Sequence, residues 1–233
     1  MDNATTPGIL TIDIGGSHVK ATVLDRSGAM ISEYKRVATP MPATPNAILA
    51  AIQKLVTNLA YEKVSVGFPG YVREGVVKTA PNPGTEAWKD FNLAQGLSQK
   101  LSKPVKVVND ADLQGIGLVK GRGLEMVVTL GTGFGTALLL DGKLLPHLEL
   151  AHHPVAKKKT YDEYIGEKAL EKIGRKKWNK RMAFVLNVLQ TVFQYDHLYI
   201  SGGNAEKLSL KLPENITIDS NKEGIKGGSR LWL

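Results

Sequence analysis

The feature that most constrains the fold is a glycine turn between two apolar strands, and the chain contains two such units. The first spans residues 8–24 and is broken at Gly15-Gly16-Ser17; the second spans residues 125–140 and is broken at Gly131-Thr132-Gly133. On both sides of each break, branched and apolar residues favour strands. A third strand is expected after each unit. Because the order of strands and turns recurs without identity of sequence, the chain is expected to contain two related halves.

Between these units, helical and strand patterns alternate, which predicts an α/β protein. A glycine-rich break at Gly121-Arg122-Gly123 divides the chain into two expected domains, residues 1–122 and 123–233, with the last helix packing back on the first domain. The apolar side of an expected helix over residues 178–193 suits a homodimer interface as well as a core. The other expected elements are strands at 30–37, 64–68, 105–108, 197–200 and 216–218, helices from about 46 to 59, 91–101 and 110–120, and a loop at 71–90.

Composition limits the compartment and the possible partners. The 233 residues include no cysteine, which excludes disulfides and thiolate metal sites and suits a reducing cytoplasm. No apolar run is long enough to span a bilayer, and the first residues lack the pattern of a secretory signal. A cytoplasmic protein without a membrane partner is therefore expected.

The net charge is +8, which favours polyanionic partners, and much of the excess lies in two stretches. One is Lys157-Lys158-Lys159 and the other is residues 168–181. These stretches are either a solvated helix face or a track for a phosphate-rich ligand. Nucleic acid is not the expected partner, because no basic-aromatic recognition motif is present and only 6% of residues are aromatic.

The glycine turns do not match the common nucleotide motifs. The third glycine of the second turn, Gly135, follows after two residues and not three, and a hairpin follows it in place of a helix. A Walker pattern is also absent. What remains is either a plain hairpin or a turn whose backbone N–H groups bind oxyanions. Asp13 and Lys20 flank the first turn, and a carboxylate at Asp13 is suited to hold magnesium beside a phosphate.

Two polar clusters offer further chemistry. Asn109-Asp110 ends an apolar strand, where α/β proteins place ligands, so Asp110 is a candidate base that accepts the proton of an attacking hydroxyl. The alternative is that Asp110 only caps the next helix. Glu149 and His152 follow the second strand–turn–strand segment, and their side chains suit the hydroxyl groups of a polyol. His152-His153 could equally be surface histidines or part of a metal site.

Together these segments resemble the ROK family of sugar kinases, within the actin-like ATPase superfamily. The matching segments, in family order, are LTIDIGGS at 10–17, VVNDAD at 107–112, LGTGFGT at 130–136, Glu149-x-x-His152 and ISGG at 200–203. Further segments, GFPG at 67–70, TAPN at 79–82 and Trp88, are most similar to the polyphosphate glucokinase branch. The resemblance implies an actin-like (ribonuclease H-like) two-domain sugar kinase fold with a central cleft.

The resemblance also implies roles for individual residues. Asp110 would activate the 6-hydroxyl of the sugar, which would be held by Asn82, Asn109, Asp110, Glu149 and His152, with Glu163 near the anomeric end. The phosphoryl donor, ATP or inorganic polyphosphate with Mg²⁺ at Asp13, would contact Asp13, Gly15, Gly16, Ser17, Lys20, Gly131, Thr132, Gly133, Gly202 and Gly203.

Three departures from the family pattern bear on the metal and on the donor. Residues 154–159 replace the cysteine-rich zinc motif of many members, so a structural zinc site is not expected. His18 replaces a small residue beside the first phosphate turn, and Asn204 replaces a third glycine in the late motif. The donor, polyphosphate or ATP, therefore stays open.

The expected function is that of a ROK-type glucokinase, a phosphotransferase acting on the 6-hydroxyl of glucose or a close hexose with polyphosphate, ATP or both. The alternative is a sugar or nucleotide sensor that keeps the fold without the reaction, because fold alone does not define function. Against the sensor stands the presence of the candidate base, both turns and the sugar cluster together.

Overall fold

The computed structural model describes residues 8–81, 84–156, 158–219 and 225–233, and the chain divides into two compact units. The first unit runs to Gly117 and takes in Ile225–Leu233; the second is Leu118–Gly224. The two-domain prediction put the change of unit at residue 122. The observed division falls at the last residue of helix α4 (Asp110–Leu118), between Gly117 and Leu118, so the glycine-rich break belongs to the second unit.

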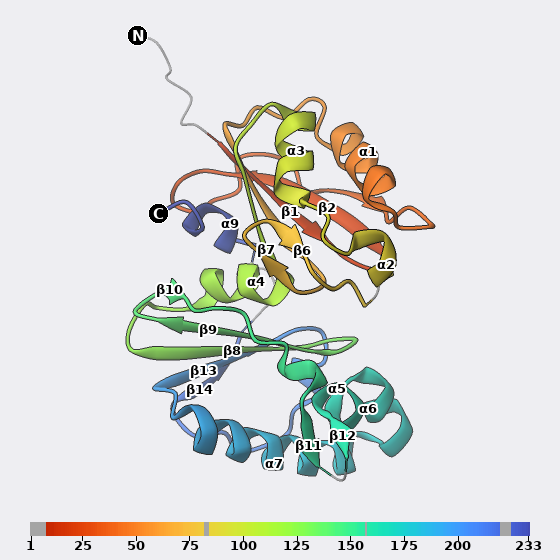
Figure 1. Ribbon diagram of the computed structural model, residues 1–233. Coiled ribbons are helices and arrows are strands. Elements are labelled where there is room, and N and C mark those ends of the chain that lie inside the picture. The colour runs from red at the N-terminus through yellow and green to blue at the C-terminus, as the bar shows by residue number, and fades with distance from the viewer. Residues whose placement is uncertain (1–7, 82–83, 157, 220–224) are drawn as a thin grey trace. The chain divides into compact units, whose positions relative to one another are not determined.

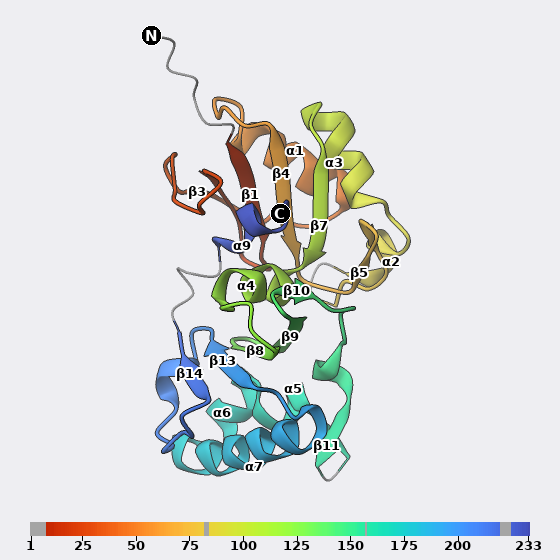
Figure 2. The same cartoon turned by 90° about the vertical axis from the view of Figure 1, so that its left-hand side faces the viewer.

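The first unit is built on a five-stranded sheet of order β3-β2-β1-β4-β7 (Figures 1 and 2). Strand β1 is antiparallel to β2 and parallel to β4, and β4 is parallel to β7. The carboxyl ends of β1, β4 and β7 therefore lie at one edge of the sheet. The strands are β1 (Ile9–Ile14), β2 (His18–Leu24), β3 (Lys35–Ala38), β4 (Lys63–Phe68) and β7 (Val105–Asn109).

Alternation along β1 determines what packs on each face of this sheet. Leu10, Ile12 and Ile14 are buried in a core with helices α1 (Pro45–Leu55) and α3 (Leu93–Leu101). Thr11 is buried on the opposite face, where the short helix α9 (Gly227–Arg230) packs against β1 and β4. Side chains on successive strand residues point to opposite faces, which explains why a polar residue sits between apolar ones here.

Two parts of the first unit differ from the sequence predictions. The third strand begins at Lys35 and not at residue 30, because the Ser32 hydroxyl accepts the N–H of Val23 and ends the regular pairing with β2. The expected loop at 71–90 contains the hairpin β5 (Val72–Arg73) and β6 (Val76–Val77) and helix α2 (Thr85–Trp88). This segment folds around Trp88, which is fully buried and donates to the Ala43 carbonyl at 2.7 Å.

The second unit repeats the same sheet order, and the predicted recurrence of strands around a glycine turn is part of this repeat. Its strands lie in the order β10-β9-β8-β13-β14 (Figure 1), with β8 antiparallel to β9 and parallel to β13. The last strand, β14, is parallel to β13. The strands are β8 (Leu124–Leu130), β9 (Phe134–Leu140), β10 (Lys143–Leu144), β13 (His197–Ser201) and β14 (Ile216–Ile218).

Helix α7 (Arg175–Phe193) covers this sheet and supplies much of its core. Its apolar side, predicted as core or dimer interface, is buried within the unit through Trp178, Met182, Val185 and Leu189. The sequence patterns did not predict the short elements before it. These are the 3-10 turn η1 (Leu150–His152), β11 (Pro154–Ala156), β12 (Lys159–Thr160), α5 (Tyr161–Ile165) and α6 (Glu167–Ile173). Figure 2 shows β11, α5 and α6 beside α7. The 3-10 turn η2 (Ala205–Lys207) follows β13.

The connection into the second unit is held by one buried carboxylate. Both oxygens of Glu125 accept backbone N–H groups, from Lys120 at 2.8 Å and from Gly121 and Arg122 at 2.7 and 3.0 Å. Tyr199 donates its hydroxyl to the same side chain at 3.0 Å. Because these donors are all satisfied by one carboxylate, the glycine-rich segment after α4 (Asp110–Leu118) has a defined conformation.

No helix in the described part of the chain is both long and apolar enough to cross a bilayer.

Candidate active site

The first glycine turn lies between β1 and β2 and is pinned by its own backbone. The N–H of Gly15 donates to the carbonyl of His18 at 2.9 Å. Thr39 donates its hydroxyl to the carbonyl of Gly15 and its N–H to the carbonyl of Ser17. Within the described residues, the N–H groups of Gly16 and Ser17 donate to no protein acceptor. An exposed turn with oriented, unused N–H groups can bind an oxyanion.

Asp13 and Lys20 face each other at the start of this turn. They are paired across β1 and β2, and Lys20 Nζ lies 3.1 Å from Asp13 Oδ2. Burial would lower the pKa of Lys20, but the Asp13 carboxylate outweighs it and raises that pKa above the ordinary value. Lys20 is therefore held as a cation beside the turn. Of the two carboxylate oxygens of Asp13, Oδ2 is the one in this ion pair.

The candidate base Asp110 lies at the same edge of the sheet as this turn. In the sheet, Asp13 pairs with Gly67, and Gly67 pairs with Val108. Asp110 lies two residues after Val108, just as the glycine turn begins two residues after Asp13, so both follow the carboxyl ends of their strands. Oδ1 of Asp110 accepts the N–H of Ala111 at 2.9 Å. The carboxylate thus stands in the first turn of α4, where the helix dipole favours negative charge.

Asn109 fixes the backbone on which Asp110 stands. Its side-chain oxygen also accepts the N–H of Ala111, at 2.8 Å, and its Nδ2 donates to the Gly70 carbonyl at 3.0 Å. Asn109 is only 6% exposed. In this structure Asn109 therefore links β7 to the end of β4, and its predicted sugar contact stays a prediction. Asn82, the other predicted sugar contact of this unit, lies outside the described residues.

The second glycine turn is built like the first. The N–H of Gly131 donates back to the Gly133 carbonyl at 3.2 Å, as Gly15 does to His18 in the first turn. Within the described residues, Thr132 and Gly133 donate their own N–H groups to no protein acceptor. The late motif lies beside it, since Asn204 donates its N–H to Leu130 and its Nδ2 to the Gly131 carbonyl, both near 3.0 Å.

The late glycine motif needs its first glycine for two reasons. Gly202 has a φ of +97°, and a Cβ there would collide with the Leu130 carbonyl. Gly203, by contrast, has open space around it. The structure therefore brings Gly131, Thr132 and Gly133 together with Gly202 and Gly203 at one edge of the second sheet.

The predicted sugar cluster contains more residues than the sequence indicated. Glu149 Oε2 lies 4.0 Å from Nε2 of His152, and Oε1 lies 3.5 Å from Nε2 of His147. The His147 side chain is 6% exposed, whereas that of His152 is 55% exposed. His147 was not predicted; the spacing His-x-Glu-x-x-His could have indicated it.

Asp162 is the other residue that sequence reasoning missed. Its Oδ1 accepts the N–H of Phe134 at 2.6 Å, and it is close enough to Glu149 and His152 to interact with both electrostatically. Burial raises the pKa of Asp162, and the hydrogen bond from Phe134 and the imidazole of His152 oppose that rise. A carboxylate thus joins Glu149 and His152 next to the second glycine turn.

The predicted residue Glu163 has a different local role. Its carboxylate accepts the N–H of Thr160 at 3.0 Å, while its own N–H donates to the Thr160 hydroxyl at 3.3 Å, which is a capping box at the start of α5. The contact of Glu163 with the anomeric end of a sugar stays a prediction, and Asp162 is a second candidate for it.

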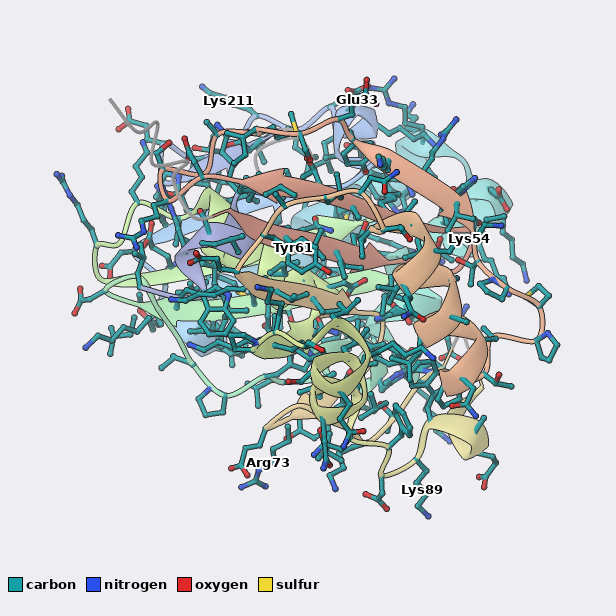
Figure 3. The ribbon with its side chains drawn as sticks, turned by 90° about the horizontal axis from the view of Figure 1, so that it is seen from above. Glu33, Lys54, Tyr61, Arg73, Lys89 and Lys211 are labelled. Carbon is teal, nitrogen blue, oxygen red and sulfur yellow. The ribbon has the colours of Figure 1, made fainter. Side chains whose placement is uncertain are left out.

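Within the described residues, no three His, Asp or Glu side chains form a group that could hold a metal ion by themselves. A cavity of about 890 Å³ opens at the other end of the first sheet. Its lining includes Gly8, which precedes β1, and Tyr61, which is labelled in Figure 3. None of the predicted site residues lines it.

Two α/β units of the same sheet order, each with a glycine turn that presents N–H groups, define the actin-like class of sugar kinases. Comparison with known proteins agrees with this class. The ROK family model matches residues 9–154, and the chain belongs to that family. The predicted fold class and the predicted family are thereby confirmed.

The chain is similar to polyphosphate glucokinases of two mycobacteria. It is 34% identical to that of Mycobacterium leprae over 208 residues, which are 84% of this chain and 63% of that protein. It is 30% identical to that of Mycobacterium tuberculosis over 227 residues, which are 88% of this chain and 83% of that protein. The chain thus spans just under two thirds of the first relative's length.

Solved structures show the same fold. An inorganic polyphosphate/ATP-glucomannokinase from an Arthrobacter species matches with a TM-score of 0.85 at 28% identity, over 97% of this chain and 98% of that one. A ROK glucokinase from Streptomyces griseus, solved with glucose and AMPPNP, matches with a TM-score of 0.77 at 20% identity, over 96% and 98%.

Proposed function

We propose that the protein is a glucokinase, a phosphotransferase that moves a phosphoryl group from polyphosphate or ATP to the 6-hydroxyl of glucose or a close hexose. The observation that carries this is the placement of Asp110 at the same sheet edge as the turn Gly15-Gly16-Ser17. A base and a phosphate-binding turn at one edge are the two parts that this reaction needs. The family and the similar glucokinases support it.

In the proposed reaction, Asp110 accepts the proton of the sugar hydroxyl while the hydroxyl oxygen attacks the terminal phosphorus of the donor. One P–O bond to the sugar forms and the bond to the rest of the donor breaks, so the donor leaves one phosphate shorter. The N–H groups of Gly16, Ser17, Thr132 and Gly133 bind the donor oxygens. Lys20 adds positive charge where negative charge accumulates.

Glu149, His152 and Asp162 bind the sugar hydroxyls in this proposal, because carboxylate and imidazole groups accept and donate together. Mg²⁺ is the cofactor we propose, since kinase donors carry it and a carboxylate with substrate phosphates is its usual ligand set. Asp13 fits this role: it is partly exposed beside the first turn, and only its Oδ2 is paired with Lys20. The ion would neutralise donor charge.

The test is glucose phosphorylation with ATP or polyphosphate as donor, by the wild-type protein and by Asp110→Asn. This substitution removes the base and little volume, so we expect glucose binding to persist and kcat to fall by roughly 10²–10⁴-fold. Asp110→Asn with full activity would refute the role of the base.

A sensor of sugar or nucleotide is the second candidate function. One observation favours it: the side chain of Asn109 is hydrogen-bonded to the backbone of Gly70 and Ala111, so these two contacts use the groups that would bind a sugar. A wild-type protein that binds glucose but phosphorylates no hexose with either donor would select the sensor.

A further inference from the structure

The second unit has a strongly basic surface next to its glycine turn. From residue 167 to residue 181, seven of fifteen residues are Lys or Arg and two are Glu, a net +5 of the chain's +8. Five of these lysines are exposed, and within the described residues none lies within ion-pair distance of a carboxylate. We call these five the lysine face: Lys168, Lys172, Lys176, Lys177 and Lys180.

The lysine face is regular. Lys168, Lys172, Lys176 and Lys180 are four residues apart, so within each helix neighbouring lysines lie about one turn, roughly 6 Å, from each other. On α7, Lys176 and Lys180 point away from Trp178, which is fully buried. Two pairs of cations at one-turn spacing, one pair on each helix, match a linear ligand that repeats its negative charge.

One end of this surface contacts the second glycine turn, and the other contacts the segment that follows the Gly202-Gly203 motif. At the start of α6, the N–H of Glu167 donates to the Thr132 carbonyl at 3.3 Å, so Lys168 follows directly on the second glycine turn. At the start of α7, Arg175 Nε donates to the Lys207 carbonyl at 2.7 Å. Lys207 ends η2, which follows the Gly202-Gly203 motif. The lysine face therefore lies directly beside the segments that we propose to bind the donor, Gly131-Thr132-Gly133 and Gly202-Gly203.

The charges at the start of α7 are unfavourable without a bound anion. Arg175, Lys176 and Lys177 occupy the first turn, which contains no acidic residue, and Gly174 gives no side-chain cap. Cations at a helix N-terminus oppose the helix dipole. An anion bound on the lysine face would offset the repulsion between these cations and the helix dipole. Without a bound anion, the repulsion remains.

We propose that the lysine face binds the part of a long polyphosphate chain that extends beyond the phosphoryl group being transferred, and so makes the enzyme prefer long chains. This inference rests on the proposed function. A nucleic acid fits less well. Trp178, the aromatic residue among these lysines, is buried and donates its Nε1–H to Ile165 at 2.7 Å, so it offers no surface for base stacking.

The experiment compares two triple variants. Lys172→Gln/Lys176→Gln/Lys180→Gln removes three charges from the lysine face, and glutamine keeps nearly the helix propensity of lysine. The matched control is Lys54→Gln/Lys89→Gln/Lys100→Gln, three exposed lysines of the first unit, two of which are labelled in Figure 3. Both variants lose the same net charge, so a general charge effect would appear in both.

Two measurements follow on each variant and on the wild type. The first is the equilibrium binding of a fluorescently labelled long polyphosphate and, separately, of a labelled single-stranded RNA as a function of salt, which needs no turnover. The second is the KM for long polyphosphate, for tripolyphosphate and for ATP. For the lysine-face variant we expect long-chain affinity to fall roughly tenfold or more, and the slope of log affinity against log salt to become shallower by about two. The KM for tripolyphosphate and ATP should stay within about twofold.

Three results would overturn the proposal. Equal losses in the control variant would show a general charge effect. Equal losses for ATP and long polyphosphate would place these lysines at the triphosphate itself or show damage to the fold. Loss of binding to a single-stranded RNA, with polyphosphate binding unchanged, would assign the surface to nucleic acid. If no donor supports turnover in the wild type, the proposed function fails, while the binding measurement still decides the role of the lysine face.

Discussion

Asp162 accepts the backbone N–H of Phe134 at 2.6 Å, and this hydrogen bond joins helix α5 to the strand that leaves the second glycine turn. The ring of Phe134 stacks on that of Tyr161, with 4.9 Å between centroids and 13° between planes. Asp162, which we propose for sugar binding, is thus hydrogen-bonded to β9, the strand that begins directly after the turn we propose for donor binding. A change in this turn should therefore also affect sugar binding.

Asp162→Asn should stabilise the ligand-free protein at neutral pH. Burial raises the pKa of Asp162 in the folded state, so the folded protein holds this proton more tightly than the unfolded chain. The stability it contributes is complete below the unfolded pKa and is lost as pH rises through the folded pKa. Asparagine still accepts from Phe134 and carries no charge. Thermal unfolding from acidic to neutral pH should show Asp162→Asn gaining on wild type as pH rises, together with an increased KM for glucose.

Alanine at Gly133 should weaken sugar binding through Asp162. A Cβ there would lie 2.9 Å from Asp162 Oδ1, so the carboxylate must move. A Cβ at Gly131 meets nothing within 4 Å, and Gly131→Ala is the matched control for the turn. We expect Gly133→Ala to raise the KM for glucose by roughly tenfold and Gly131→Ala to leave it within about twofold. Steady-state kinetics with glucose varied checks this, and equal glucose KM values in the two variants would contradict it.

Tyr199→Phe should cost about 1 kcal/mol of stability, because it removes one hydrogen bond from the Glu125 carboxylate. Glu125→Gln should cost more, about 1–3 kcal/mol, since one of its two oxygens becomes a donor that faces backbone N–H groups. Urea denaturation at neutral pH measures both. If the two substitutions cost the same, Glu125 does not organise the segment at 120–122.

The same contact affects the titration of Tyr199. Burial, followed by the hydrogen bond to Glu125 and the charge of Glu125, raises its pKa to about 12. An ultraviolet titration of the folded protein should therefore show the last tyrosine ionising at a lower pH in Glu125→Gln than in the wild type, yet still above the ordinary tyrosine pKa because the burial remains. An unchanged titration would show that the carboxylate has little influence on this hydroxyl.

Trp232 should anchor the C-terminal segment to the first unit. Its Nε1 donates to the Ser65 hydroxyl at 2.9 Å, and the Nζ atoms of Lys63 and Lys106 lie 5.0 and 4.7 Å from its ring. Trp232→Ala should cost about 2 kcal/mol, and Trp232→Phe, which keeps an aromatic ring and removes the hydrogen bond to Ser65, about 1 kcal/mol. Urea unfolding of both variants separates the ring contacts from the hydrogen bond; equal costs would mean that the ring contributes nothing.

Much of the architecture was predictable because it depends on local patterns. The strands around each glycine turn, the division into two related halves and the strand that ends at Asn109 all follow from alternation and from breaks in it. The helix start at Leu93, two residues later than expected, depends on a cap: Asn92 accepts the N–H of Gln95 at 2.9 Å. The sequence carried that signal as well.

The site was less predictable where local and tertiary contacts compete for neighbouring residues. Glu163 has the spacing of a capping box with Thr160, and that local pattern takes its carboxylate. Asp162, the residue before it, points back to Phe134, which is 28 positions away in sequence. No periodicity could distinguish these two carboxylates. His147 differs, because the spacing His-x-Glu-x-x-His carried a signal for it; packing then brings its Nε2 within 3.5 Å of Glu149.

The amino-acid sequence by itself determined the two glycine turns, the strands that hold them and the position of Asp110 at a strand end, because backbone geometry and hydrophobic alternation act over a few residues. Only the tertiary structure decided which side chains surround those turns. It brought Asp162 and His147 to the sugar cluster and attached the lysine face to the second turn, because these contacts depend on how whole elements pack and on which buried polar groups find partners there.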